Sequence, residues 1–270
     1  MNRVFRAGRY TLPLGEKTYI MGICNVTPDS FSDGGEFFAP NKAIAHALQM
    51  QQQGADVIDI GGQSTRPGYQ RISPREEWER LAPVLKGLRG RLQVPLSVDT
   101  FYPEVAALAC EHGADIINDV SGFSQEMWEV AAQYACGCVV MHPCGEEEEI
   151  LQRVHTFFLG KQEEAARYGI ASDRLCMDPG IGFGKTYEQN LSLIRRVEEY
   201  RLPDCMLLMA ASRKRVIGQP CGNPPFRERM AGTLAAHTAA QLAGADMLRV
   251  HDVEEAVQAA RVTDALLHLG

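Results

Sequence analysis

Short apolar runs alternate along this chain with stretches long enough to form a helix. Each of eight such runs ends in, or leads directly into, a polar residue able to take part in chemistry. These expected strands are Thr18–Cys24, Asp56–Gly62, Pro95–Val98, Asp115–Asn118, Cys138–Met141, Arg174–Met177, Met206–Ser212 and Met247–Val250. Strands that alternate with helices form βαβ units around a parallel sheet, and eight such units close into a barrel. The pattern therefore predicts one α/β domain over residues 1–270, folded as a (β/α)8 TIM barrel.

The expected helices carry recognisable start and stop signals. Ser73 is a favourable N-cap, with Pro74 and Glu76 in the first turn that follows. Gly54 suits the C-cap of a helix over residues 41–53. Further helices are expected to begin near Pro103, Gln125, Ile150, Glu188, Phe226 and Val253.

Some segments depart from this repeat of strand and helix. Residues 3–13 alternate loosely between apolar and polar positions and predict a short N-terminal hairpin at the floor of the barrel. The connections over 25–40 and 61–72, after the first and second strands, are long and rich in Gly, Pro, Ser and Thr, which is typical of lids and binding loops. The acidic run Glu146–Glu149 is expected in the first turn of a helix, where the helix dipole favours carboxylates. A cation site there is the less favoured alternative.

Composition places the chain among ordinary globular proteins, with 45% hydrophobic and 23% charged residues. No apolar stretch approaches the ~20 residues that a membrane-spanning helix needs, so no membrane partner is expected. The N-terminal segment lacks the apolar core of a secretory signal, and cytoplasmic residence is therefore the expectation. A net charge of −7, without a block of Lys and Arg, disfavours nucleic acid as a partner.

The cysteines do not suggest a disulfide framework, because several lie inside apolar runs and are expected to be reduced core thiols. These are Cys24, Cys138, Cys176 and Cys205. The one cluster that resembles a zinc site comprises Cys136, Cys138, His142 and Cys144. Closed zinc sites usually contain Cys-x₂₋₄-Cys pairs, and this spacing does not match them. No metal is expected there.

The polar residues that follow the strands are expected to form one active site. The C-termini of barrel strands meet at one rim, which is the catalytic face of such barrels. The residues at this rim supply amide, hydroxyl, carboxylate, ammonium, guanidinium and imidazole groups. Because the chain is acidic overall, an anionic ligand must be held by local cations. The rim provides Arg66, Arg213, Lys214 and Arg249, which suits a small phosphorylated substrate.

Eight motifs along the chain resemble those of the dihydropteroate synthase family. The first two are Asn25–Gly35 and Gly61–Gly68, after the first and second expected strands. The others follow in family order and are Ser97–Thr100, Ile116–Asp119, Met141–His142, Asp178–Lys185, Ser212–Lys214 and Arg249–Asp252. One such motif is weak, whereas eight in register over nearly the whole chain are specific. The resemblance implies a transferase of folate biosynthesis. It joins 4-aminobenzoate to 6-hydroxymethyl-7,8-dihydropterin pyrophosphate and releases 7,8-dihydropteroate and pyrophosphate.

The resemblance implies a deep polar slot for the pterin. The Asp178 carboxylate can pair with the guanidine-like edge of N–H donors that a pterin presents. Asp99 and Asn118 can satisfy other polar ring atoms, and Lys214 can donate to the ring carbonyl. Contacts with the ring faces are assigned to Met141, Phe183 and Arg249. For Met141, ordinary barrel core is an equally good interpretation.

Pyrophosphate requires cations and N–H donors, and the resemblance assigns it to Asn25, Thr65, Arg66, Arg249 and His251. A lone histidine is more often structural. His251 follows Arg249 by two positions, however, so both project to one side of a strand, and barrels often bind phosphate near their last strands. Mg²⁺ is the implied cofactor. It would use the Asn25 carbonyl oxygen and phosphate oxygens, since magnesium takes few protein ligands.

In this family the C–O bond breaks largely before the amine attacks, an SN1-like course. The protein then stabilises the departing pyrophosphate and holds the amine in line. Asp33 of the first loop is expected to close over the cationic centre and exclude water. The catalytic residues implied are Asn25, Asp33, Arg66, Lys214 and His251. The 4-aminobenzoate site implied comprises Phe31, Ser64, Thr65, Pro67, Phe183, Ser212 and Lys214.

The resemblance also implies sulfonamide inhibitors as ligands and a homodimer built on the last helices, such as Leu234–Leu242. The chain departs from the family pattern at Gln63, where the second motif usually has Glu, and the loop over 143–149 looks shortened. Gln63 removes a charge beside Ser64, which bears on hydrogen bonding within that loop.

Other functions compete with this interpretation. A pterin-binding methyltransferase domain shares the barrel and the pterin slot, but it has no pyrophosphate to bind, so the loops over 25–35 and 61–68 favour the synthase. A P-loop over Gly180–Lys185 fails on its spacing. A non-catalytic pterin-binding paralogue is expected to have lost part of a set that this chain keeps, namely Asn25, Arg66, Lys214 and His251.

Overall fold

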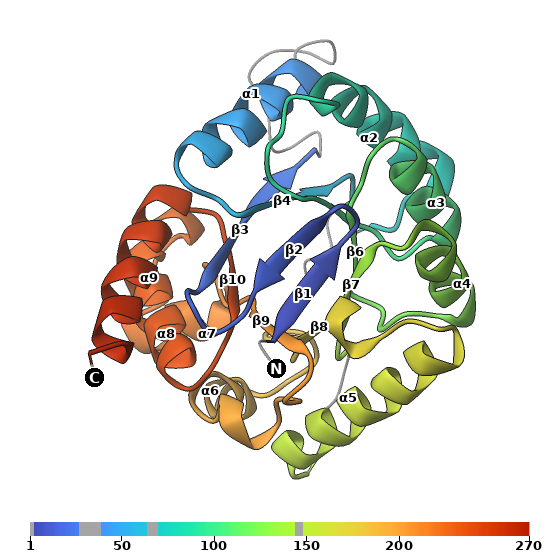
Figure 1. Ribbon diagram of the computed structural model, residues 1–270. Coiled ribbons are helices and arrows are strands. Elements are labelled where there is room, and N and C mark those ends of the chain that lie inside the picture. The colour runs from blue at the N-terminus through green and yellow to red at the C-terminus, as the bar shows by residue number, and fades with distance from the viewer. Residues whose placement is uncertain (1–2, 27–38, 64–69, 144–147, 270) are drawn as a thin grey trace.

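A closed barrel of parallel strands forms the centre of the molecule (Figure 1). The computed structural model describes residues 3–26, 39–63, 70–143 and 148–269. Around the barrel the strands follow one another in chain order, and the last pairs with the first. They are β3 (Tyr19–Asn25), β4 (Val57–Gly61), β5 (Leu96–Asp99), β6 (Ile116–Asp119), β7 (Gly137–Met141), β8 (Leu175–Asp178), β9 (Met206–Met209) and β10 (Met247–Val250). The predicted (β/α)8 TIM barrel is confirmed.

Helices surround the barrel and connect its strands (Figure 1). They are α1 (Ala39–Gln52), α2 (Pro74–Leu88), α3 (Pro103–Glu111), α4 (Gln125–Tyr134), α5 (Ile150–Arg167), α6 (Tyr187–Arg195), α7 (Arg215–Gly218), α8 (Met230–Leu242) and α9 (Val253–Leu267). The predicted N-cap of α2 is confirmed, because the Ser73 hydroxyl accepts from the Glu76 N–H at 3.2 Å. No helix among the described residues is long and apolar enough to cross a membrane.

Three boundaries differ from the sequence prediction. Glu148 and Glu149 precede α5 and do not lie in its first turn, because Glu149 has a left-handed backbone (φ +56°) that ends the turn before the helix. Phe226–Glu228 forms a 3₁₀ turn, and α8 begins later, at Met230. Arg229 donates to the Pro224 and Arg213 carbonyls, which holds this segment as a turn. The strand expected over Met206–Ser212 ends at Met209.

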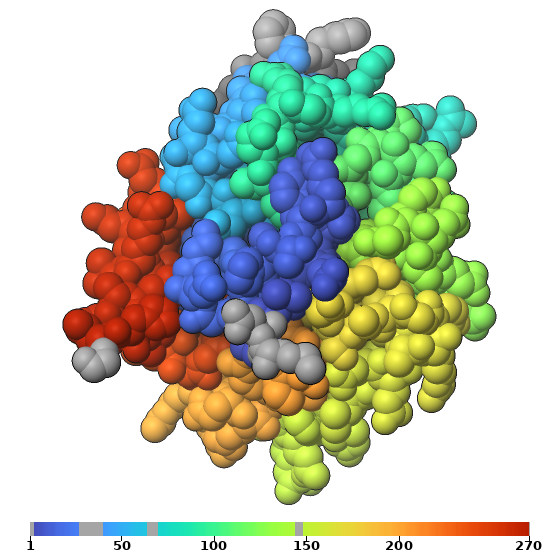
Figure 2. Space-filling view, viewed as in Figure 1, coloured from blue at the N-terminus to red at the C-terminus, as the bar shows by residue number. Residues whose placement is uncertain are grey.

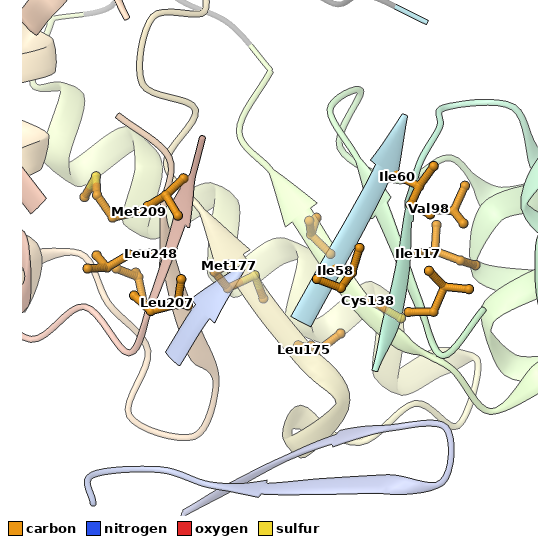
Figure 3. Packing of buried hydrophobic residues seen from close by; sticks show 14 of the residues in the cluster. Ile58, Ile60, Val98, Ile117, Cys138, Leu175, Met177, Leu207, Met209 and Leu248 are labelled. Atoms are coloured by element: carbon orange, nitrogen blue, oxygen red, sulfur yellow. The ribbon is translucent and has the colours of Figure 1, made fainter. Parts of the chain in front are cut away.

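The apolar core lies mainly between the barrel and the helices. Side chains alternate between the two faces of each strand, so every second residue points outward. In β4 the outward residues are Ile58 and Ile60, and both are fully buried under the helices. Figure 3 shows them with their counterparts from other strands, including Val98, Ile117 and Leu248. This layer fixes the strands and therefore the side chains that point into the barrel.

The predicted hairpin is present and covers the amino end of the barrel. Strands β1 (Val4–Ala7) and β2 (Tyr10–Pro13) pair antiparallel, and they lie across the barrel opening in Figures 1 and 2. Phe5 and Ala7 are fully buried, in a second apolar cluster with Met21, Val57 and other inward residues. The floor of the barrel is thus apolar, and the opposite end is left for polar chemistry.

Gly137→Ala is expected to destabilise the packing of the N-terminal hairpin against the barrel. A Cβ at Gly137 would lie 2.8 Å from the Phe5 ring and 3.0 Å from the Arg6 carbonyl oxygen. Relief of that overlap is expected to lower the free energy of unfolding by about 1–3 kcal/mol. Gly160→Ala in α5 is the control, because its Cβ would have no neighbour within 4 Å and alanine favours helix by roughly 0.5–1 kcal/mol. Urea denaturation of both variants measures the difference, and equal effects would contradict the predicted contact.

Candidate active site

The inward face of the barrel changes from apolar to polar toward the carboxyl ends of its strands. In β4, Val57 points inward and belongs to the buried cluster with the hairpin. Asp59, two residues later, points inward as well and is polar. The same change occurs in β6 from Ile116 to Asn118 and in β8 from Cys176 to Asp178. Because all the strands are parallel, these polar side chains share one end of the barrel.

Asp59 is the centre of a buried polar network. Its side chain has no exposed surface. The carboxylate accepts hydrogen bonds from Ser97 Oγ at 2.6 Å, Asn118 Nδ2 at 3.0 Å and Arg249 Nε at 2.7 Å. These donors come from three other strands, so one carboxylate ties together four strands of the barrel. Burial of such a charge is tolerated because its oxygens are satisfied.

Arg249 links this network to a second carboxylate. Its Nη2 donates to Asp99 Oδ2 at 2.8 Å while its Nε is held by Asp59. Asp99 ends β5 and pairs in register with Asn118. Burial raises the pKa of Asp99, and the neighbouring guanidinium of Arg249 opposes that rise. The result is a hydrogen-bonded patch of carboxylate, guanidinium and amide groups.

Asp178 ends β8 at a tight turn. The Gly180 N–H donates to Asp178 Oδ1 at 2.7 Å, which orients the carboxylate. Gly180 has φ +70°, and a Cβ there would lie 2.2 Å from the His142 carbonyl oxygen, so the turn requires glycine. Asp178 as a whole is 5% exposed. Burial raises the pKa of Asp178, and the Lys214 ammonium opposes that rise.

Lys214 follows the short turn after β9 and is half-buried. Its Nζ donates to the Ile181 carbonyl at 2.6 Å and lies 4.8 Å from the centre of the Phe183 ring. Burial lowers the pKa of Lys214 to about 8, although the carboxylate of Asp178 favours the charged form. Lys214, Phe183 and Asp178 are therefore neighbours, as the sequence interpretation required of pterin-binding residues.

His251 lies just beyond β10 and is fixed by Ser212. The Ser212 hydroxyl accepts from the His251 backbone N–H at 3.2 Å and lies 2.9 Å from His251 Nδ1. Phe226 packs edge-on against the imidazole, with ring centres 5.2 Å apart. The contact between the Ser212 hydroxyl and His251 Nδ1 is a hydrogen bond that orients the imidazole. Ser212 and Phe226 thus hold the imidazole beside the end of β10.

The other predicted residues divide between the barrel rim and segments outside the described residues. Asn25 ends β3 and pairs with Gly61, which in turn pairs with Asp99. Met141 is 1% exposed and pairs in register with Asp178. Its contact with a ligand stays a prediction. The residues outside the described part of the chain are Phe31, Asp33, Ser64, Thr65, Arg66 and Pro67.

Sequence reasoning missed two polar residues of this region. Asp59 stands inside an apolar run and not at its end, yet its position between Ile58 and Ile60, which face the helices, marks it as inward-facing. Lys185 donates to the carbonyls of His142, Gly180 and Phe183 at 3.0–3.3 Å and so holds the loop that carries Phe183. No sequence signal pointed to that role, because all three acceptors are backbone atoms.

Comparison with known proteins agrees with this geometry. Residues 21–251 match the family model described as "Pterin binding enzyme". A dihydropteroate synthase of Synechocystis sp. is 43% identical, over 96% of this chain and 93% of that protein. The structure of Xanthomonas albilineans dihydropteroate synthase with 4-aminobenzoic acid superposes with a TM-score of 0.95 at 38% identity, covering all of both chains. The structure of the Yersinia pestis dihydropteroate synthase with a sulfonamide drug superposes with a TM-score of 0.91 at 36% identity. The match covers 99% of this chain and all of the Yersinia pestis chain. The chain therefore belongs to the pterin-binding enzyme family, among its dihydropteroate synthases.

Proposed function

We propose that the polar end of this barrel joins 4-aminobenzoate to 6-hydroxymethyl-7,8-dihydropterin pyrophosphate, with release of pyrophosphate and formation of 7,8-dihydropteroate. The observation that carries the proposal is the single cluster formed by Asp99, Asn118, Asp178, Lys214 and Arg249 at the carboxyl ends of the strands. It combines ring-binding hydrogen-bond partners with cations for an anionic leaving group. The relatives of this chain are named dihydropteroate synthase, after this reaction.

The pterin ring is assigned to the space bordered by Asp178, Asn118 and Asp99. Asp178 is oriented by Gly180 and can accept from the amino and ring N–H groups of a pterin. Lys214 lies beside that carboxylate and is assigned to donate to the ring carbonyl. A heterocycle that lacked these groups would leave buried carboxylates unpaired, at a cost of about 1–3 kcal/mol each. Phe183 and Met141 are the assigned apolar contacts.

The pyrophosphate is assigned to the neighbouring rim, where Ser212 orients the His251 imidazole and where Asn25 ends β3. Arg249 adds positive charge from inside the barrel. The described residues contain no cluster of three His, Cys, Asp or Glu side chains that would hold a metal by themselves. Asn25 offers one hard amide oxygen, which fits a magnesium ion held mostly by phosphate and water. When bound, Mg²⁺ would neutralise charge on the leaving group.

In the assigned mechanism the C–O bond breaks ahead of amine attack. His251, Arg249 and Arg66 stabilise charge on the departing pyrophosphate, and the protein keeps water from the pterin cation. The second loop, with Ser64, Thr65 and Pro67, is assigned to 4-aminobenzoate together with Ser212, and Asp33 of the first loop to closure. Sulfonamides are expected to compete for the 4-aminobenzoate position.

Lys214 is expected to produce the alkaline limb of the pH profile. Its pKa is lowered from 10.5 to about 8 by burial, so the native enzyme loses the donor proton above that pH. kcat/KM for the pterin pyrophosphate is therefore expected to fall above pH about 8, since this parameter reports the free enzyme. Between about 8 and 10.5 the unfolded chain still holds this proton. The contribution of Lys214 to the free energy of unfolding therefore rises with pH while activity falls.

Lys214→Arg separates this explanation from a general pH effect. A guanidinium remains protonated throughout the range, so the variant is expected to have lower activity but no limb near pH 8. Steady-state rates from pH 6 to 10, with circular dichroism to monitor folding, provide the measurement. A limb that persists unchanged in Lys214→Arg would assign it to another group.

The direct test of function is a coupled assay with purified protein, pterin pyrophosphate, 4-aminobenzoate and magnesium. Release of pyrophosphate is expected to require the amine and to match the dihydropteroate formed. Release without the amine would mean an uncoupled hydrolase. Pterin binding without turnover would mean a non-catalytic member of the family.

We also propose that the enzyme is a cytoplasmic homodimer, with the last helices at the interface. Large apolar side chains are exposed there, at the end of α8, in α9 and just after it. They are Leu242, Val262, Leu266, Leu267 and Leu269, each 48–77% exposed. Several large apolar side chains exposed on neighbouring elements favour association with a second copy. Light scattering of the Val262→Glu/Leu266→Glu variant is expected to give the monomer mass, against a dimer for the parent.

A further inference from the structure

Two side chains of α8 hold the backbone of the turn that carries the cationic end of the site. Thr233 Oγ1 accepts from the Arg213 N–H at 2.9 Å and donates to the Arg229 carbonyl at 2.8 Å. One helical turn later, His237 Nε2 accepts from the Ala211 N–H at 3.1 Å. Helix α8 thus supplies acceptors for successive parts of the turn between β9 and α7.

This turn needs such support because it leaves the sheet early. β9 ends at Met209, so the Ala211 N–H is bonded to a side chain and not to a strand. Arg213 adopts a left-handed backbone (φ +56°), which is unfavourable for a residue with a Cβ. The Lys214 N–H closes the turn on the Ala211 carbonyl at 3.2 Å. Ala211 is therefore the fixed point from which Lys214 is placed.

The imidazole of His237 acts here as a neutral acceptor. The side chain is 2% exposed, and burial, aided by the nearby Lys214, lowers the pKa of His237 to about 3. With Nε2 accepting, the ring proton is on Nδ1, and that atom finds no partner among the described residues. An apolar side chain would fill this space without leaving a buried N–H unpaired. The presence of histidine at this buried position is therefore explained by the hydrogen bond that Nε2 accepts from the Ala211 N–H.

We propose that His237 is a positioning residue that fixes the Ala211 amide and thereby sets Lys214 for the pterin and Ser212 for His251. The proposal rests on the proposed function of those residues. His237 contacts no reacting atom itself. Its effect passes through the turn, since Ser212 bonds His251 and Lys214 lies beside Asp178. A shift of the turn moves both groups relative to the ligand.

His237→Leu and His237→Gln test this role as a pair. Leucine keeps the bulk but removes the acceptor, whereas the glutamine carbonyl can reach the position of Nε2. The dissociation constant of 6-hydroxymethyl-7,8-dihydropterin is expected to rise about 10-fold or more in His237→Leu, because small displacements of positioned groups weaken binding strongly. In His237→Gln it is expected to stay within about threefold, since the bond is restored.

Gln241→Leu is the matched control. Gln241 is buried on the same helix and donates to the Ala260 carbonyl and Asp264, away from the turn. It is expected to lower the melting temperature as His237→Leu does, yet to bind the pterin like the parent. Equal loss of pterin affinity in Gln241→Leu and His237→Leu, or unchanged affinity in His237→Leu, would overturn the proposal. A parent that binds pterin but forms no dihydropteroate would instead overturn the proposed function.

Discussion

Asp178→Asn is expected to lower kcat/KM for the pterin pyrophosphate by roughly 10³-fold, with the fold intact. Asp178 is 5% exposed and is oriented by the Gly180 N–H at 2.7 Å. An amide cannot accept with both of its polar atoms, so it meets the N–H edge of a pterin with one donor facing another. Loss of one partner of a buried charged hydrogen-bonded pair costs on the order of 2–5 kcal/mol, which includes a 10³-fold effect.

The measurement is steady-state kinetics together with the dissociation constant of the unreactive 6-hydroxymethyl-7,8-dihydropterin. Both are expected to change by a similar factor, because the lost interaction binds the ring in ground and transition states alike. Asp204→Asn is the control, since Asp204 is exposed and lies before β9 at the opposite end of the barrel. If Asp178→Asn retained pterin affinity within a few-fold, the ring would have to bind elsewhere.

Asp59→Asn is expected to damage both stability and ligand binding. The carboxylate has no exposed surface and accepts from Ser97, Asn118 and Arg249. Without the Asp59 charge, the largely buried Arg249 guanidinium keeps only its ion pair with Asp99. Breaking a buried ion pair from one side costs about 3–5 kcal/mol, so the free energy of unfolding is expected to fall by about that amount.

Activity is expected to fall by more than the loss of folded protein explains, because Asn118 and Arg249 lose the group that holds them. Urea denaturation gives the free energy of unfolding. Kinetics normalised to the concentration of folded protein give the additional loss of activity. Asp173→Asn serves as the control, since its ion pair with Arg6 is exposed and worth only about 0–1 kcal/mol. An Asp59→Asn variant as stable as Asp173→Asn would contradict the buried network.

Most of the barrel was predictable from the sequence because strands with an apolar outer face and intervening helices leave a strong periodic signal. The runs ending at Asn25 and Asp178 became β3 and β8 with those residues as their last positions. The N-terminal hairpin was also predictable, since its short strands alternate. These are local patterns, and local patterns are what one sequence records most directly.

The rest depended on contacts between distant segments. Asp59 was hidden in an apolar run, and its importance appears only when Ser97, Asn118 and Arg249 converge on it. The turn after β9 depends on the hydrogen bond from the Ala211 N–H to His237, which is 26 positions away in the sequence. The left-handed backbone of Glu149, which ends the turn before α5, likewise has no signature in the acidic run.

The most direct test of the central claim is a crystal structure with 6-hydroxymethyl-7,8-dihydropterin, pyrophosphate and magnesium bound. The account predicts the pterin ring on Asp178, with Asn118 and Asp99 at its other polar atoms and Lys214 at its carbonyl. The pyrophosphate is predicted beside His251 and Asn25. A pterin bound away from Asp178, or a pyrophosphate remote from His251, would contradict the account.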